Sequence, residues 1–439
     1  MSAMLSFENA PPLSVPARFF VCAPAYGVLA GLLVLAEGPD LLLSRWTPAV
    51  LALTHLLTVG VLLQVMIGAL FQLLPVAAGA GIVQPRRVAG VVHGALNLGA
   101  GLLTLGFYLS LTLLLKLAGV ALAVAVGGFV AVAGFGLWRK PHTSPSIPAL
   151  KLALLGLVIT LGFGLYLLAA YVLGLAGRMG GLTAQHAAWG LVGWSATLIV
   201  GVAYVVVPMF QLTPAYPRRI TRALVPLLFL LLLGWSVVQL IGGALGVALI
   251  GTALALALGA FAAVTLGLQA KSRRAEADTT FLYWRLAMFS TLFAAAVWAA
   301  MPWFGSVAAA GSPPLPLVFT LGVVVIFGVL ASVICGMLYK ILPFLCWLHL
   351  QRVGMQRGIF KTPHMGVFLA ERPMRRQFFL HLATLAAWLA GIGLPVVLPL
   401  AGLLMTVSFG WLGANLLAAL RAAGREERTL LGAAAAVPA

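Results

Sequence analysis

Histidines are the side chains of this protein best suited to chemistry inside a membrane. Four of the seven lie within or beside long apolar runs: His55, His93, His186 and His381. Imidazole is the commonest ligand of protein-bound metals and an axial ligand of haem iron, and intramembrane histidines usually face the bundle interior with a partner. All four are therefore candidate haem ligands, and His55 and His186 are the candidate ligands of iron or another metal. The alternative for each is a structural hydrogen bond.

The other ionisable residues place little chemistry inside the membrane. All eight acids fall in loops or at the edges of apolar runs, whereas proton pumps and cation-coupled transporters keep a carboxylate at depth. The three cysteines have neither paired nor metal-ligand spacing. His142, His349 and His364 lie in or next to basic loops, where we expect them to be solvated. Proton pumping and sodium coupling are therefore not expected.

A short pattern, Gly-x-x-aromatic-x-x-x-Pro, ends three long apolar segments. The prolines that close its copies lie 133 and 135 residues apart: Pro75, Pro208 and Pro343. Each copy has a further glycine 15 residues before its proline: Gly60, Gly193 and Gly328. The first two segments open with His55 and His186, and the third has no histidine at either offset. The pattern predicts an internal repeat in which the candidate ligands occupy equivalent places.

Composition indicates a membrane protein. The chain is 63% apolar and 8% charged, with a net charge of +18 and a mean hydropathy of +1.12. The positive charge is confined to short loops between apolar runs, which favours a role in topology over nucleic-acid binding. The first 20 residues do not read as a cleaved signal peptide, so we expect the first span to stay in the membrane. No c-type haem attachment, P-loop or dinucleotide fingerprint is present.

Twelve segments meet the length of about 20 apolar residues that a span requires. They are 19–38, 50–76, 89–113, 117–138, 150–173, 185–209, 223–243, 245–268, 281–303, 315–342, 378–394 and 396–419. One side of these spans holds 23 of the 26 Lys and Arg residues. The positive-inside rule then predicts a multi-pass protein of a bacterial inner membrane with both termini in the cytoplasm. Arg285 and Lys340 are expected to extend to the inner face.

The predicted fold is all-α, with 12 transmembrane helices in three four-helix arcs around a pseudo-threefold axis. Repeats that start on the same side of a membrane are parallel, related by an axis along the membrane normal. We place them at 19–138, 150–268 and 281–419, within a single membrane domain spanning 1–439. The basic loop 349–377 is expected to rest on anionic headgroups, and the alternative is a docking surface for an acidic partner.

This layout resembles subunit I of the haem-copper oxidase superfamily, most closely its cbb-type branch. The text that carries the resemblance in span 2 is Thr54-His55-Leu56-Leu57, running to Pro75. In span 6 it is Gln185-His186-Ala187-Ala188-Trp189-Gly190, running to Tyr204-Val205-Val206-Val207-Pro208. In span 10 it is Tyr339-Lys340-Ile341-Leu342-Pro343. The family's span 2 histidine ligates low-spin haem and its span 6 histidine ligates copper, so the resemblance implies a haem b site.

The chain departs from the family where the family binds oxygen. Span 10 reads Val318-Phe319-Thr320-Leu321-Gly322, without the family's His-x-His pair, and span 7 lacks its His-His pair. Copper, oxygen reduction and nitric oxide reduction are therefore not expected. The chain is identified as a divergent member, similar to the NnrS-type membrane proteins, which are linked to haem and nitric oxide handling.

Three functions follow as hypotheses. The first is a haem-binding membrane protein acting in electron transfer, haem handling or nitric oxide response, with His93 and His381 as a second haem pair near the inner face. The second is a transporter or channel for a small or anionic solute, which would reuse the repeated bundle. The third is a scaffold or assembly factor for a respiratory complex, which would dock through 349–377. A redox partner or a respiratory-complex subunit is the partner that these hypotheses imply, besides membrane lipids. We do not expect an oxidase, and a redox role is left open.

Overall fold

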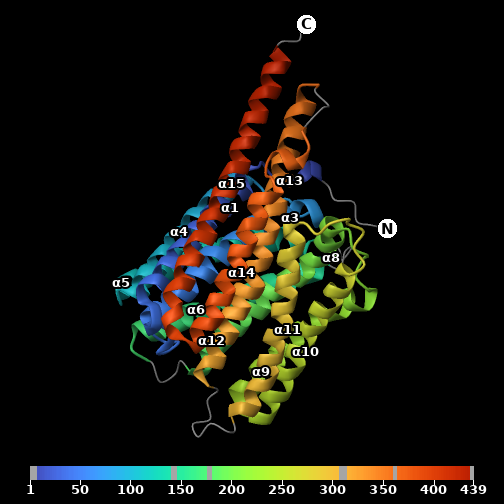
Figure 1. Cartoon of the computed structure of the whole chain (residues 1–439). Helices are drawn as coiled ribbons and strands as arrows, with labels where there is room; N and C mark the ends of the chain where they lie inside the picture. The colour runs from blue at the N-terminus through green and yellow to red at the C-terminus, as the bar shows by residue number, and fades with distance from the viewer. Residues whose placement is uncertain (1–6, 140–145, 176–179, 306–313, 359–362, 436–439) are drawn as a thin grey trace.

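The computed structural model describes residues 7–139, 146–175, 180–305, 314–358 and 363–435 (Figure 1). Within these ranges the regular secondary structure is helical, which confirms the predicted all-α class. Eleven stretches of the described chain are long and apolar enough to cross a membrane: Ser14–Leu42, Pro48–Ala77, Pro85–Tyr108, Thr112–Trp138, Ser146–Val172, Gly181–Gln211, Arg218–Ile241, Ala244–Gln269, Thr279–Pro302, Leu315–Gln356 and Pro395–Gly432. The protein is therefore an integral multi-pass membrane protein.

The eleventh of the twelve predicted spans, 378–394, lies within a more polar helix. This helix, α14 (Glu371–Gly393), begins with a charged turn that contains Glu371, Arg372, Arg375 and Arg376. It packs along α15 (Leu398–Ala435) and contacts α11 (Thr279–Gly305). Its first half buries the polar side chains of Gln377 and His381, so its apolar character is lower than that of the other long helices.

Three long helices share an unusual interruption. They consist of α2 (Pro48–His55), η3 (Leu56–Leu63) and α3 (Gln64–Ala77); α7 (Gly180–Ala188), η5 (Trp189–Ala196) and α8 (Thr197–Gln211); and α12 (Leu315–Val323), η6 (Val324–Ala331) and α13 (Ser332–Gln356). In each case the middle piece is an eight-residue π-helix. The repeated glycines Gly60, Gly193 and Gly328 are the fifth residues of these pieces. π-Helical pieces are rare and frequently accompany functional sites.

The repeated prolines end two of these helices but not the third. α3 ends at Ala77 and α8 at Gln211, each within a turn of its proline. α13 continues past Pro343 to Gln356, so the first part of the predicted 349–377 loop is helical. The continuation packs against α15, where His349 Nε2 lies 3.4 Å from Glu427 Oε2. This packing between distant segments offsets the hydrogen bond that proline removes.

The C-terminal ends of α13 and α15 extend beyond the predicted spans. α15 runs to Ala435, although the last span is predicted to end at residue 419. α15 and the end of α13 project together beyond the other helices (Figure 1). Arg352 of α13 donates to the carbonyl of Ala10 at 2.8 Å, so the N-terminal segment is held at the same end.

Helix pairing follows a regular order. Adjacent long helices form hairpins in three places: α4 (Pro85–Tyr108) with α5 (Thr112–Trp138), α9 (Arg218–Ile241) with α10 (Ala244–Gln269), and α14 with α15. α5 also packs against α6 (Ser146–Val172), α10 packs against α11, and α15 packs against α1 (Ser14–Glu37). The first and last long helices, α1 and α15, are therefore packed side by side. Their contact matches those of α5 with α6 and α10 with α11, which are consecutive in the chain.

Each π-helix packs against the long helix that precedes it in the chain: η3 on α1, η5 on α6 and η6 on α11. A Cβ on Gly156 of α6 would collide with the carbonyl of Gly193 in η5. Farther along, Ser146 Oγ donates to the carbonyl of Gly201 at 2.8 Å, and Thr280 Oγ1 makes the matching bond to Gly336 at 2.9 Å. Close approach through glycine and a hydroxyl bonded to a carbonyl are usual means of joining helices in lipid. η6 contacts both η3 and η5, so the three pieces meet in the interior.

Candidate haem site

The structure brings His55 and His186 together. Their ring centroids lie 6.3 Å apart and their planes are inclined by 22°. His55 is the last residue of α2, directly before the π-helix η3, and His186 lies in α7, three residues before η5. Residues separated by more than a hundred positions in the chain therefore form one pair.

Both imidazoles are held through the same ring atom. His55 Nδ1 lies 2.8 Å from the carbonyl oxygen of Leu51, and His186 Nδ1 lies 3.1 Å from that of Thr160. A carbonyl only accepts, so each Nδ1 carries the proton and each neutral ring keeps a lone pair on Nε2. A hydrogen bond from one ring nitrogen to a carbonyl is the usual way in which a ligating histidine is oriented.

Small and aromatic residues surround the pair. Phe107 of α4 lies against His55, with ring centroids 5.4 Å apart, and packs edge to face on Tyr171 at 5.7 Å. His186 lies against Gly164 of α6, where an added Cβ would come within 3.0 Å of its Cε1. The absence of a side chain at Gly164 thus allows the imidazole to reach the carbonyl one turn earlier.

The pair suits a ligand that brings most of its own coordination. No group of three or more His, Cys, Asp or Glu residues able to hold a metal occurs in the part of the chain that the structure describes. A haem needs only axial ligands from the protein, since its porphyrin supplies the other donors. Two imidazole nitrogens on one ion lie about 4 Å apart, because each is about 2 Å from the metal. The ring centroids of His55 and His186 lie 6.3 Å apart, so a single ion between the two rings is the simplest arrangement that would use both.

A surface groove opens near His186. It has a volume of about 450 Å³ and lies between α6 and α7, lined by apolar residues that include Ile159, Phe163 and Leu182. Leu182 is four residues before His186 and so lies on the same face of α7, one turn away. None of its lining residues is a histidine. The groove therefore flanks the pair but does not contain it.

His93 and His381 have separate surroundings. His93 of α4 packs edge to face on Phe19 of α1, with ring centroids 5.0 Å apart. His381 is fully buried, stacks on Phe327 of η6 at 4.2 Å, and shares a 2.9 Å hydrogen bond between its Nε2 and Ser332 Oγ. The ring contacts of the described residues join His55 to His186 but do not join these two. The suggested inner haem pair stays a prediction.

His381 borders a buried polar network. Gln377, one turn before it on α14, accepts from the hydroxyls of Tyr283 and Tyr339. Gln377 Nε2 donates to Ser408 Oγ at 3.0 Å, and Asn415 Nδ2 donates to the Tyr339 hydroxyl at 2.9 Å. These bonds join α11, α13, α14 and α15. Satisfied polar groups of this kind hold helices together in lipid.

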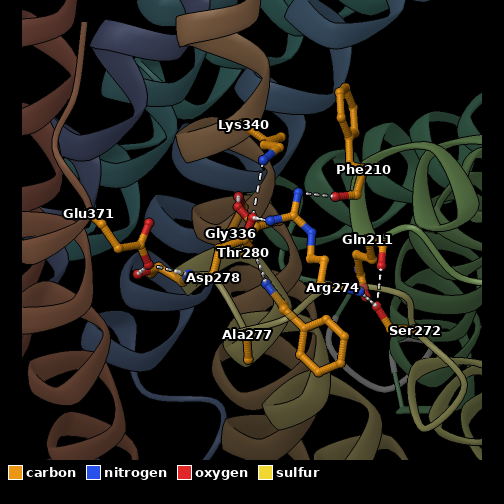
Figure 2. Close-up of polar contacts among 12 residues, drawn as sticks. Phe210, Gln211, Ser272, Arg274, Ala277, Asp278, Thr280, Gly336, Lys340 and Glu371 are labelled. Carbon is orange, nitrogen blue, oxygen red and sulfur yellow. Dashed lines mark hydrogen bonds and ion pairs between the residues drawn. The ribbon is translucent and has the colours of Figure 1, made fainter. Parts of the chain in front are cut away.

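A second polar cluster was not apparent from the sequence. Figure 2 shows Asp278 between two cations: its Oδ2 lies 2.8 Å from Arg274 Nη1 and 3.1 Å from Lys340 Nζ. Arg274 Nη2 also donates to the carbonyl of Phe210 at 2.8 Å. Lys340 was expected to extend to the inner face, which stays a prediction, and its ammonium group pairs with an acid. The cluster ties the loop between α10 and α11 to α8 and α13, and an acid four residues after Arg274 was the available signal.

Hydrogen bonds hold both ends of the loop between α10 and α11. Asp278 is the N-cap of α11 and accepts from the amide of Phe281 at 2.9 Å, as capping residues do. Glu371 of α14 accepts at 2.6 Å from both the amide and the hydroxyl of Thr279. Ser272 Oγ donates to the carbonyl of Gln211 at 2.6 Å. This cluster is structural, since every charge in it has a partner.

Comparison of the chain with models of known protein families finds no matching family, and comparison with curated proteins finds no relative.

Proposed function

We propose that this protein binds one haem b in the membrane, with His55 and His186 as its axial ligands. The observation that carries the proposal is the pair itself: near-parallel rings 6.3 Å apart, each held through Nδ1 by a backbone carbonyl. A hydrogen bond from one ring nitrogen to a carbonyl is how ligating histidines are usually oriented, and a haem with two axial histidines needs two imidazoles at close range.

The arrangement of helices supports a kinship with haem-copper oxidase subunit I. In this proposal α1 to α5, α6 to α10 and α11 to α15 are three four-helix arcs around a pseudo-threefold axis. The matching contacts of α5 with α6, α10 with α11 and α15 with α1 support it, as do the three π-helices at equivalent offsets. In that family the two histidine positions serve separate centres, whereas here the proximity of the rings favours a single shared one.

A haem held by two histidines supplies one-electron transfer. The residues of this chain orient it: the carbonyls of Leu51 and Thr160 fix the tautomers, and Phe107 and Tyr171 exclude water from one side. With its basic side in the cytoplasm, the pair lies toward the outer face of a bacterial inner membrane. A redox protein or a respiratory-complex subunit on that side is the expected partner.

The test is the pigment of the purified protein. Protein produced with ample haem should show a Soret band, a pyridine haemochrome spectrum of haem b and one iron per chain. His55→Ala and His186→Ala should each lose the low-spin spectrum. His364→Ala is the matched control, because His364 is exposed and outside the spans, and it should keep the wild-type spectrum.

A colourless, iron-free preparation would rule the proposal out. Uptake of a small or anionic solute by such haem-free protein in liposomes would instead support the transporter hypothesis.

A further inference from the structure

A surface groove separates the loop between α3 and α4 from the last turns of α5. Its volume is about 660 Å³. The loop contributes Ala80 and Val83 to one wall, α5 contributes Phe135 to the other, and Arg139 lies just past the end of α5. Small residues line both walls: a Cβ added at Gly136 of α5 would touch Ala80 at 3.5 Å and the carbonyl oxygen of Gly81 at 3.6 Å.

The matching place later in the chain is filled. There the loop after α8 carries Tyr216, whose ring lies parallel to Phe261 of α10 with centroids 6.2 Å apart. Its hydroxyl is 2.9 Å from Thr265 Oγ1, and burial raises the pKa of the phenol, which stays neutral. The 79–81 stretch of the first loop consists of glycine and alanine and has no ring to insert. The first groove is therefore left for another occupant.

Positive charge gathers at the groove. The Arg139 guanidinium is exposed and lies 4.1 Å from the centre of the Phe135 ring. Arg86 and Arg87 are exposed in the first turn of α4, between the lining residues Val83 and Val88. The ion pairs found among the described residues involve none of these three arginines. The site therefore offers guanidinium groups that take part in none of these ion pairs, and guanidinium groups bind phosphate well.

The apolar residues of the groove lie on the outer surface of the helix bundle. Val83 is 80% exposed and Phe135 is 65% exposed, and Trp138 beside Arg139 is also exposed. Tryptophan next to basic residues at a helix end is typical of the headgroup layer. An occupant must thus present a long apolar part at the level of Phe135 and an anion at the level of Arg139.

We propose that this groove binds one anionic phospholipid of the surrounding membrane. An acyl chain lies between the 79–83 loop and α5, and the phosphate is held by Arg139 together with the arginines at the start of α4. The volume of about 660 Å³ is within the range of ligand pockets, about 300–1,000 Å³. The lipid does for the first loop what Tyr216 does for the second: it fills the space against the neighbouring helix.

Native mass spectrometry of the purified full-length protein tests this. Phosphatidylglycerol and phosphatidylcholine with identical acyl chains are titrated separately. Arg139→Glu removes the anion contact, and Ala131→Trp fills the groove from an exposed position on its α5 wall without changing charge. Arg139→Glu should bind phosphatidylglycerol about tenfold more weakly than wild type, the scale of one to two surface charges. Ala131→Trp should also weaken binding, because the indole would occupy the space proposed for the acyl chain.

The matched control is Arg219→Glu, which reverses an exposed arginine at the start of α9, beside the filled place. It should bind phosphatidylglycerol as wild type does. Size-exclusion chromatography checks that each variant is folded. Equal binding of both lipids by wild type, or unchanged phosphatidylglycerol binding by Arg139→Glu and Ala131→Trp, would overturn the proposal. Displacement of the lipid by inorganic phosphate alone would also overturn it, because the acyl chain would then contribute nothing.

Discussion

Gly164 controls how closely His186 can approach α6. An added Cβ would lie within 3.0 Å of the imidazole, so a branched side chain must push the ring away from the Thr160 carbonyl. We predict that Gly164→Val weakens haem binding about 10- to 100-fold, the usual effect of losing a residue that orients a ligand. Haem titration of apoprotein measures it.

The matched substitution is Gly162→Val, two residues away on the same helix, where a Cβ meets no atom within 4 Å. It should leave haem affinity unchanged. Equal affinities for the two variants would show that the contact at Gly164 does not position His186.

His381 stabilises the packing of α14 against α13 through its hydrogen bond with Ser332. It is fully buried and bonded to Ser332, so His381→Leu should lower the free energy of unfolding by about 1–3 kcal/mol through an unpaired hydroxyl. The haem content should stay at the wild-type value. Thermal unfolding followed by fluorescence, with iron quantitation on the same sample, measures both. A loss of iron would instead support a second haem at the inner face.

At the scale of elements, the π-helices place the candidate ligands. An eight-residue π-helix begins directly after His55, and another begins at Trp189, with two residues between it and His186. Its wider turn changes the direction in which the preceding residues face, and a glycine at its centre lets the neighbouring helix come close. The third copy keeps the π-helix but has no histidine. The interruption is therefore a property of the fold, and the histidines are an addition to it.

The contact of Gly156 with η5 gives a prediction for this scale. Gly156→Ala would place a methyl group against the Gly193 carbonyl, so we expect a loss of stability of about 1–3 kcal/mol from overpacking. Gly127→Ala and Gly128→Ala, on a helix face with no atom within 4 Å, should be neutral or slightly stabilising. Thermal unfolding in one detergent compares the three. Similar melting temperatures would show that η5 can shift to make room.

At the scale of the whole molecule, Asp278 joins segments that the chain separates. It neutralises Arg274 and Lys340 and caps α11. Asp278→Ala should therefore destabilise the protein by about 2 kcal/mol, the sum of a lost cap and two partly exposed ion pairs. Glu276→Ala, an exposed acid in the same loop, is the control and should have no effect. Limited proteolysis of the 270–278 loop should accelerate in the first variant alone.

The helical class and most of the membrane spans could be predicted from the sequence, because the apolar length of a segment is a local property. The meeting of His55 with His186 could not, since spacing along a helix gives depth in the membrane but not which neighbour the side chain faces. The continuation of α13 past Pro343 was missed for a related reason: its stabilising partner, α15, is distant in the chain. The ion pair of Lys340 with Asp278 was missed for the same reason, because the two residues lie 62 positions apart.

The packing of α15 on α1 has a topological consequence. α1 and α15 pack together although no peptide segment links them directly. Glycines on both helices, Gly31 and Gly402, allow this close packing, because a Cβ at either position would collide with the backbone of the other helix. Because packing alone holds α1 against α15, we expect packing also to hold the helices together when the chain is cut in a loop. Two separately translated fragments, 1–275 and 276–439, should therefore associate in the membrane and co-purify as one complementing pair.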